Sequence, residues 1–129
     1  MMNNEIVNTV SLGANTMVIV GRHYNKYHML FTENDTAFAI TATPNLFAKM
    51  RTELKFAYNK STESRVLIWH EDEDDSYTYS IQFKGNKKNK DIVMSVTYEH
   101  MDILKEITAT LDETMISELH KVFVSNLSE

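Results

Sequence analysis

Basic and aromatic side chains are interleaved in the segment 22–28 of this chain. Proteins bind single-stranded nucleic acid with aromatic rings that stack on bases and with cations that follow the phosphates. The residues with this chemistry are Arg22, Tyr24, Lys26 and Tyr27. They are therefore candidate nucleic-acid contacts, although a hairpin turn whose tyrosines cover a sheet edge would have the same composition.

A second basic group surrounds Gly85. It consists of Lys84, Lys87, Lys88 and Lys90. Lysines in a turn can contact phosphates as point charges. The same residues also suit a solvated loop, or a guard that keeps an edge strand from pairing with another molecule. Under the nucleic-acid hypothesis, this turn is the second part of the binding surface.

Five consecutive carboxylates follow Trp69-His70. They are Glu71, Asp72, Glu73, Asp74 and Asp75. Such a run repels itself and stays in water, and it lacks the glycine and the spaced bidentate glutamate of an EF-hand loop. The run therefore predicts no calcium site. Together with Trp69, it indicates either a surface for a basic protein partner or a solvated turn.

The remaining sequence holds no catalytic or metal-binding signature. There is no cysteine, so thiol catalysis and thiolate metal sites are excluded. The histidines form no pair spaced four apart on a helix, as a helical zinc site would need. The three glycines stand too far apart for a phosphate loop or a dinucleotide fingerprint. We therefore predict a non-enzymatic protein without metal or cofactor.

The size and composition indicate one globular domain over 1–129. A chain of 129 residues, 43% of them hydrophobic, is long enough to bury one core. The net charge of −5 argues against a strongly basic coat protein for nucleic acid. No signal peptide or membrane-length apolar run is recognisable. We expect a cytoplasmic protein that does not enter a membrane. The abundance of Asn, Lys, Ile and Thr is typical of an AT-rich, phage-like genome.

Apolar and polar residues alternate along most of the chain, which predicts antiparallel strands. In the first of these strands, Ile6, Val10 and Leu12 are expected on one face. Helical spacing replaces the alternation at 46–58 and again at 115–127. The predicted strands cover residues 5–12, 16–20, 27–31, 36–43, 65–69, 77–83, 92–98 and 103–110.

Helix-start signals precede both helical segments. Thr43 is expected to cap the first helix, with Pro44 in its first position. Residues 110–113 fit a capping box that begins at Thr110. The predicted core contains Ile40, Leu46, Met50, Leu54, Ile107, Leu119 and Phe123. The methionines expected at core positions are Met17, Met29, Met50, Met94 and Met115.

The same tetrapeptide, Ile-Thr-Ala-Thr, precedes both helices at 40–43 and 107–110, about half the chain apart. With a two-residue slip, the apolar stripes of the two helices also align. An internal duplication into 1–61 and 62–129 would explain both observations. Chance combined with the threonine preference of helix caps is the alternative explanation.

This layout resembles that of the PUR-repeat and whirly-type proteins. Those proteins contain two units of four strands and a helix, and they bind single-stranded nucleic acid. The resemblance covers nearly the whole chain and rests on element order around the two Ile-Thr-Ala-Thr junctions. No family motif matches residue by residue, so no functional residue is carried over. The acidic net charge departs from what nucleic-acid binding favours.

Together these patterns predict an α+β fold, with one or two antiparallel sheets carrying two helices. The alternating face of Tyr77, Tyr79, Ile81 and Phe83 is too apolar for open water, so we expect it to pack on a helix or on a partner. An isologous homodimer is one such arrangement. Two functions follow. The first is binding of single-stranded nucleic acid, and the alternative is a protein-binding regulator or inhibitor of a kind that phages encode.

Overall fold

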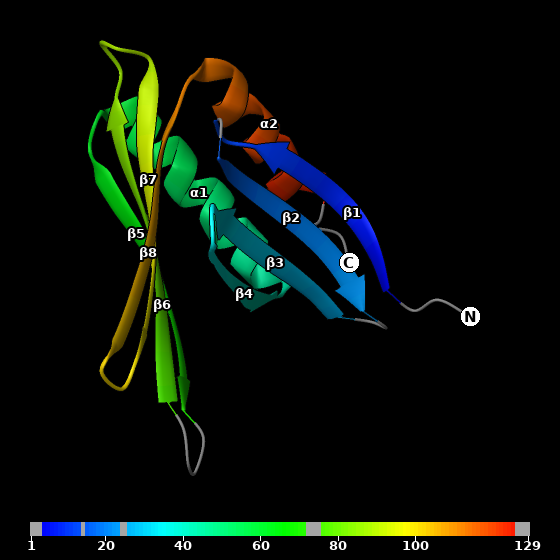
Figure 1. Cartoon of the computed structure of the whole chain (residues 1–129). Coiled ribbons are helices and arrows are strands. Elements are labelled where there is room, and N and C mark those ends of the chain that lie inside the picture. The colour runs from blue at the N-terminus through cyan, green and yellow to red at the C-terminus, as the bar shows by residue number, and fades with distance from the viewer. Residues whose placement is uncertain (1–3, 14, 24–25, 72–75, 126–129) are drawn as a thin grey trace.

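The computed structural model describes residues 4–13, 15–23, 26–71 and 76–125. Over these residues, the chain forms two four-stranded antiparallel meanders, each followed by a helix (Figure 1). The first half consists of β1 (Asn4–Ser11), β2 (Thr16–His23), β3 (Lys26–Glu33), β4 (Thr36–Ala42) and α1 (Pro44–Lys60). The second consists of β5 (Glu63–Glu71), β6 (Ser76–Asn86), β7 (Asp91–His100), β8 (Ile103–Leu111) and α2 (Glu113–Ser125). The predicted α+β class and element order are confirmed.

Both helices cover the inner faces of the two sheets. In Figure 1, α1 passes behind the first sheet, β1–β4, and it contacts β5 and β6 of the second sheet, β5–β8. α2 contacts α1, β1, β7 and β8. In the part of the chain that is described, neither helix is long and apolar enough to cross a membrane.

One hydrophobic core joins these layers, and Phe47 of α1 lies fully buried in it. Its ring meets that of Tyr27 in β3 edge to face, with centroids 6.1 Å apart, and that of Phe123 in α2 at 6.5 Å. The Tyr79 hydroxyl of β6 donates a hydrogen bond of 2.7 Å to the Ala39 carbonyl of β4, which links the two sheets. The seven predicted core residues are all buried, which confirms that prediction: Ile40, Leu46, Met50, Leu54, Ile107, Leu119 and Phe123.

The predicted face of β1 is wrong at Ile6. Ile6 is 71% exposed, whereas Val10 and Leu12 are buried. The pairing of β1 with β2 shifts between Ile6 and Asn8, so one extra residue is accommodated there. Because side chains alternate along a strand, one extra residue sends the preceding side chains to the opposite face. Ile6 therefore points away from the core.

Met17 is the second error among the predicted core residues. It is 37% exposed, whereas Thr16 and Val18 on either side of it are buried. The strand places Thr16, Val18 and Val20 inward, so Met17 must face outward. The other predicted core methionines lie in the core or pack against it: Met29, Met50, Met94 and Met115.

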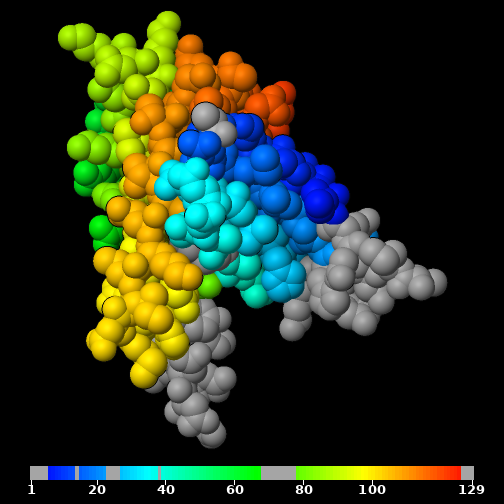
Figure 2. Space-filling model, in the orientation of Figure 1, coloured from blue at the N-terminus to red at the C-terminus, as the bar shows by residue number. Residues whose placement is uncertain are grey.

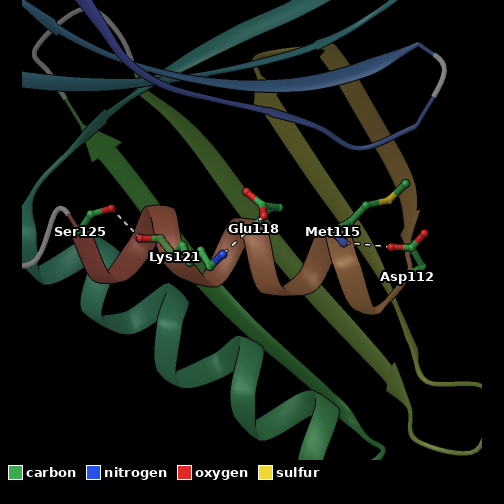
Figure 3. A network of polar contacts seen from close by, with 5 residues as sticks. All are labelled: Asp112, Met115, Glu118, Lys121 and Ser125. Carbon is green, nitrogen blue, oxygen red and sulfur yellow. Dashed lines mark hydrogen bonds and ion pairs between the residues drawn. The ribbon is translucent and has the colours of Figure 1, made fainter.

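The cap of α1 is confirmed, whereas that of α2 is not the predicted residue. The Leu46 N–H donates to Thr43 Oγ1 at 3.2 Å. At α2, the Met115 N–H donates to Asp112 Oδ1 at 2.9 Å (Figure 3), so the cap is Asp112 rather than Thr110. β8 continues through Leu111, so Thr110 is still part of the strand.

The two Ile-Thr-Ala-Thr segments occupy equivalent places in the two meanders. Ile40 and Ala42 are buried in β4, and Ile107 and Ala109 are buried in β8. After the second tetrapeptide, β8 extends to Leu111 before α2 begins, which accounts for the two-residue slip between the helix stripes. A common origin of the halves and a single domain over 1–129 stay predictions.

The apolar face of β6 packs on the protein's own helices. Tyr79, Ile81 and Phe83 are buried in the core that α1 and α2 share. Of the two coverings expected for this face, a helix or a partner, the described structure has the helix. The side chain of Tyr77 lies outside the description.

Candidate nucleic-acid interface

The β6–β7 turn is fastened to the end of α1. The Gly85 N–H donates to the Thr62 carbonyl at 2.9 Å, and the Lys87 N–H donates to Ser61 Oγ at 2.9 Å. Ser61, with a φ of 54°, forms the left-handed cap of α1. These bonds fix the turn to a rigid element, so its side chains project from one defined end of the molecule.

Five exposed lysines surround this junction, which we call the lysine end: Lys60, Lys84, Lys87, Lys88 and Lys90. Lys84 lies on β6 rather than in the turn, and its Nζ is 4.0 Å from Glu63 Oε1. Both of those side chains are more than half exposed, so the ion pair is weak and leaves Lys84 able to contact another anion. The lysine end thus gathers positive charge on a protein whose net charge is negative.

The outer face of β5–β8 adjoins the lysine end and is rich in uncharged hydrogen-bonding groups. The uncharged residues Gln82, Ser95 and Thr108 lie in register on β6, β7 and β8, and Arg65 of β5 adds a positive charge at the end of this row. The Ser95 and Thr108 hydroxyls are 3.4 Å apart. Such a face can donate to phosphates, sugars and base edges without adding negative charge along this row.

An exposed aromatic residue that the sequence patterns did not indicate lies close to the lysine end. Phe56 is 48% exposed on α1, one helical turn before Lys60. The signal was present in the sequence, because Phe56 falls outside the apolar stripe of that helix. An exposed phenyl ring beside cations is the combination that stacks on unpaired bases.

The structure separates the two basic groups that the sequence analysis selected. Arg22 is exposed near the end of β2, and Lys26 begins β3, so both belong to the first sheet. Figure 1 shows the β2–β3 end of that sheet far from the β6–β7 turn. A short single strand at the lysine end is therefore not expected to reach Arg22 as well. Tyr24 lies outside the described residues, as do the surroundings of the Lys26 side chain.

Tyr27 belongs to the core. It is 7% exposed, and its ring packs against Phe47. A ring held in this way does not offer a free face to a base. The alternation of Tyr27, Met29 and Phe31, all three buried, was a sequence signal for this placement.

The acidic segment is described only in part. Trp69 and Glu71 lie in β5, at the end of the β5–β6 hairpin that is opposite the lysine end. The side chains of both, and the whole of Asp72, Glu73, Asp74 and Asp75, are outside the described residues. Within the described part of the chain, no three His, Asp or Glu side chains gather where they could hold a metal ion.

Comparison with known proteins shows that this chain resembles others in its fold alone. No protein family and no curated sequence matches it. Solved structures of the whirly type do match, as the element order predicted. The plant transcriptional regulator PBF-2 superposes with a TM-score of 0.65 at 5% identity, over 95% of this chain and 81% of the other. WHY3 from Arabidopsis thaliana gives 0.62 at 3% identity, over 93% and 85%.

A third match comes from a trypanosome. MRP1/MRP2 of Trypanosoma brucei superpose with a TM-score of 0.58 at 14% identity, over 96% of this chain and 81% of the other. Identities this low establish a shared fold and nothing about shared residues. The predicted resemblance to whirly-type proteins is confirmed at that level.

Proposed function

We propose that this protein is a non-enzymatic binder of single-stranded nucleic acid that uses the lysine end and the adjoining outer face of β5–β8. The observation that carries the proposal is the group of five exposed lysines fixed to the end of α1 and β6. Phosphate contacts from such a group supply most of the affinity of sequence-independent binding. The shared fold supports the proposal, because the whirly-type resemblance implies this class of ligand.

The rest of the surface has separate contributions in this proposal. Phe56 supplies a stacking ring, and the hydroxyl and amide groups of the outer face supply hydrogen bonds. Arg22 and Lys26, on strands of the first sheet, form a distant second contact that only a longer strand would reach, and Tyr24 stays a candidate from its sequence position alone. The absence of cysteine fits a reducing compartment, so we place this role in the cytoplasm.

The lysine turn provides the direct test. In a variant with Lys87, Lys88 and Lys90 all changed to Gln, affinity for a fluorescent single-stranded oligonucleotide is expected to fall about 10- to 100-fold at low salt. Three lost phosphate contacts should also make the slope of log affinity against log salt shallower by about 2. Fluorescence anisotropy at several salt concentrations measures both quantities.

The matched control removes the same charge elsewhere. Changing Lys49, Lys105 and Lys121 to Gln alters the net charge equally but leaves the lysine end intact. If both triple variants weaken binding alike, only the overall charge matters and the proposed surface is wrong. If the unmodified protein binds no oligonucleotide at low salt, but a pull-down with it isolates a defined protein partner, the regulator hypothesis replaces the nucleic-acid hypothesis.

We further propose an isologous homodimer through the outer face of β1–β4. Two registered rows of that face carry no charged side chain. They consist of Thr9, Ile19, Leu30 and Ala39, and of Ser11, Met17, Thr32 and Ala37. Figure 2 shows this face, in blue and cyan, at the molecular surface. Two copies with a net charge of −5 could meet there without bringing like charges together.

A single charge should disrupt this homodimer. Leu30→Lys is expected to shift the protein from dimer to monomer in light scattering coupled to gel filtration, because it would bury an unpaired ammonium in the interface. Thr108→Lys, on the outer face of the other sheet, should leave the dimer intact. A monomeric wild-type protein at high concentration would refute the interface.

A further inference from the structure

A hollow of about 270 Å³ lies between α1 and α2, whose side-by-side arrangement is visible in Figure 3. Its apolar lining residues are Leu54 of α1, which is 1% exposed, and Ile116 of α2, which packs against the core. Polar side chains from both helices complete the lining. The volume is close to the lower end of the range of small-molecule sites, so the hollow suits one small ligand rather than a longer chain.

The acidic group of the hollow is already engaged. The Tyr58 hydroxyl donates to Glu113 Oε2 at 3.1 Å, which joins the two helices. Burial, followed by the hydrogen bond and the charge of Glu113, raises the pKa of Tyr58, so the phenol stays protonated. Glu113 keeps its negative charge, and Lys55 provides the opposing cation of the lining, to which a ligand anion would be attracted.

His120 supplies an unsatisfied polar atom. Its Nε2 is shielded from solvent and has no hydrogen-bond partner in the described structure. Leaving a buried polar atom unpaired is unfavourable, so a partner at this atom would be stabilising. Burial, and then the charges of Lys55 and Arg51, lower the pKa of His120 below 6.5, so the imidazole is neutral at neutral pH. Because His120 lines the hollow, a ligand bound there is the candidate partner for this nitrogen.

From this arrangement, we propose that the hollow binds one nucleotide unit, meaning a heterocyclic base with its sugar and a single phosphate. The base would lie on Leu54 and Ile116. Its edge, which carries donors and acceptors together, would meet the Asn59 amide, the Ser117 hydroxyl and His120. The phosphate would pair with Lys55. An aliphatic carboxylate would use the cation but leave the amide, hydroxyl and imidazole without partners, which is why a nucleotide fits better.

This inference deepens the proposed function and rests in part on it. The lysine end holds the phosphates of a strand in any sequence, whereas the hollow would hold one base. The nucleotide could be the terminal unit of a bound strand or a free mononucleotide. Both share the same chemistry, and the experiment below distinguishes them.

The test uses the full chain and adenosine and uridine 5′-monophosphates as probes. Amide NMR shifts should appear in the second half of α1 and the first half of α2, with a Kd below about 1 mM. Lys55→Gln should weaken binding about tenfold, and Lys49→Gln, on another side of α1, should not change it. The phosphate should raise the pKa of His120 in an NMR titration, because a nearby anion favours the imidazolium.

Two further probes, and a variant that fills the hollow with a larger side chain, test whether the whole mononucleotide is recognised. Inorganic phosphate alone and adenosine alone should each bind more weakly than the mononucleotide. Equal binding by inorganic phosphate, or no shifts at millimolar mononucleotide, overturns the proposal. Ser117→Leu, at an exposed position, should abolish mononucleotide binding but leave oligonucleotide binding to the lysine end.

The two sites can then fail independently. If the protein binds mononucleotides but no oligonucleotide, the proposal for the hollow is supported and the proposed function at the lysine end is wrong. If a 5′-phosphorylated oligonucleotide shifts the NMR signals of Lys55 and His120, and free mononucleotide competes with it for the hollow, the occupant is the strand terminus. Oligonucleotide binding without such competition identifies a free mononucleotide as the occupant.

Discussion

Replacing Gly85 with alanine is expected to destabilise the protein by about 3 kcal/mol or more, at the upper end of what overpacking costs. A Cβ at this position would lie 2.0 Å from the Ala57 carbonyl oxygen and 3.0 Å from the Tyr58 Cα. Both atoms belong to the backbone of α1, so no side chain can rotate away. Relief requires that the end of α1 move off β6, which breaks the Gly85–Thr62 hydrogen bond.

Urea denaturation followed by circular dichroism measures this loss. Lys84→Ala is the appropriate control, because Lys84 is the adjacent residue but is exposed on the outer face, so it should change the free energy of unfolding by less than about 1 kcal/mol. Equal effects of the two substitutions would mean that α1 and β6 are not in such close contact. Since the turn depends on this contact, Gly85→Ala should also weaken oligonucleotide binding in whatever fraction remains folded.

Phe47→Ala is expected to cost about 3–5 kcal/mol, as removal of a fully buried phenyl ring usually does. Phe47 is 0% exposed and contacts Tyr27 and Phe123, so its ring joins the first sheet, α1 and α2. A loss of this size is a large part of the total stability of about 5–15 kcal/mol of a typical domain. The variant should therefore be partly unfolded at 37 °C, as its thermal melting curve would show.

Phe56→Ala supplies a control with the same chemical change on the same helix. Because Phe56 is 48% exposed, its removal should cost less than about 1 kcal/mol. It should nevertheless weaken oligonucleotide binding, since stacking contributes roughly 1–3 kcal/mol per base. A stable Phe47→Ala protein would show that the packing of the first sheet, α1 and α2 does not depend on the Phe47 ring. Unchanged binding by Phe56→Ala would remove the ring from the proposed interface.

Most of the strands and both helices could be predicted because each has an uninterrupted period. The alternation in β6 and β7, and the apolar stripe of α1, follow directly from which faces are buried. The bulge in β1 could not be predicted, because the extra residue at Val7 is itself apolar and leaves no polar interruption. The cap of α2 was misplaced because Thr110 and Asp112 are both good caps, and only the length of β8 decides between them.

The candidate sites were less predictable, because they depend on contacts between distant segments. The lysine turn was visible as composition, whereas Lys60 joins it only because Ser61 and Lys87 are hydrogen-bonded across 26 positions. The hollow between the helices depends on Tyr58 and Glu113, which are 55 positions apart. Tyr27 gave two conflicting signals in the sequence: its chemistry suggested a ligand contact, whereas its place in the strand alternation suggested the core.

The hydrogen bond from Tyr79 to Ala39 has a consequence for how the molecule avoids aggregation. β4 is a terminal strand of its sheet, and terminal strands present carbonyl and amide groups that can recruit strands from neighbouring molecules. At Ala39, a phenol from the other sheet already occupies the carbonyl. On the opposite border, the bulge of β1 interrupts the regular pattern that an added strand would need. At these two places the borders of this sheet offer an irregular template to an added strand, which works against fibre growth.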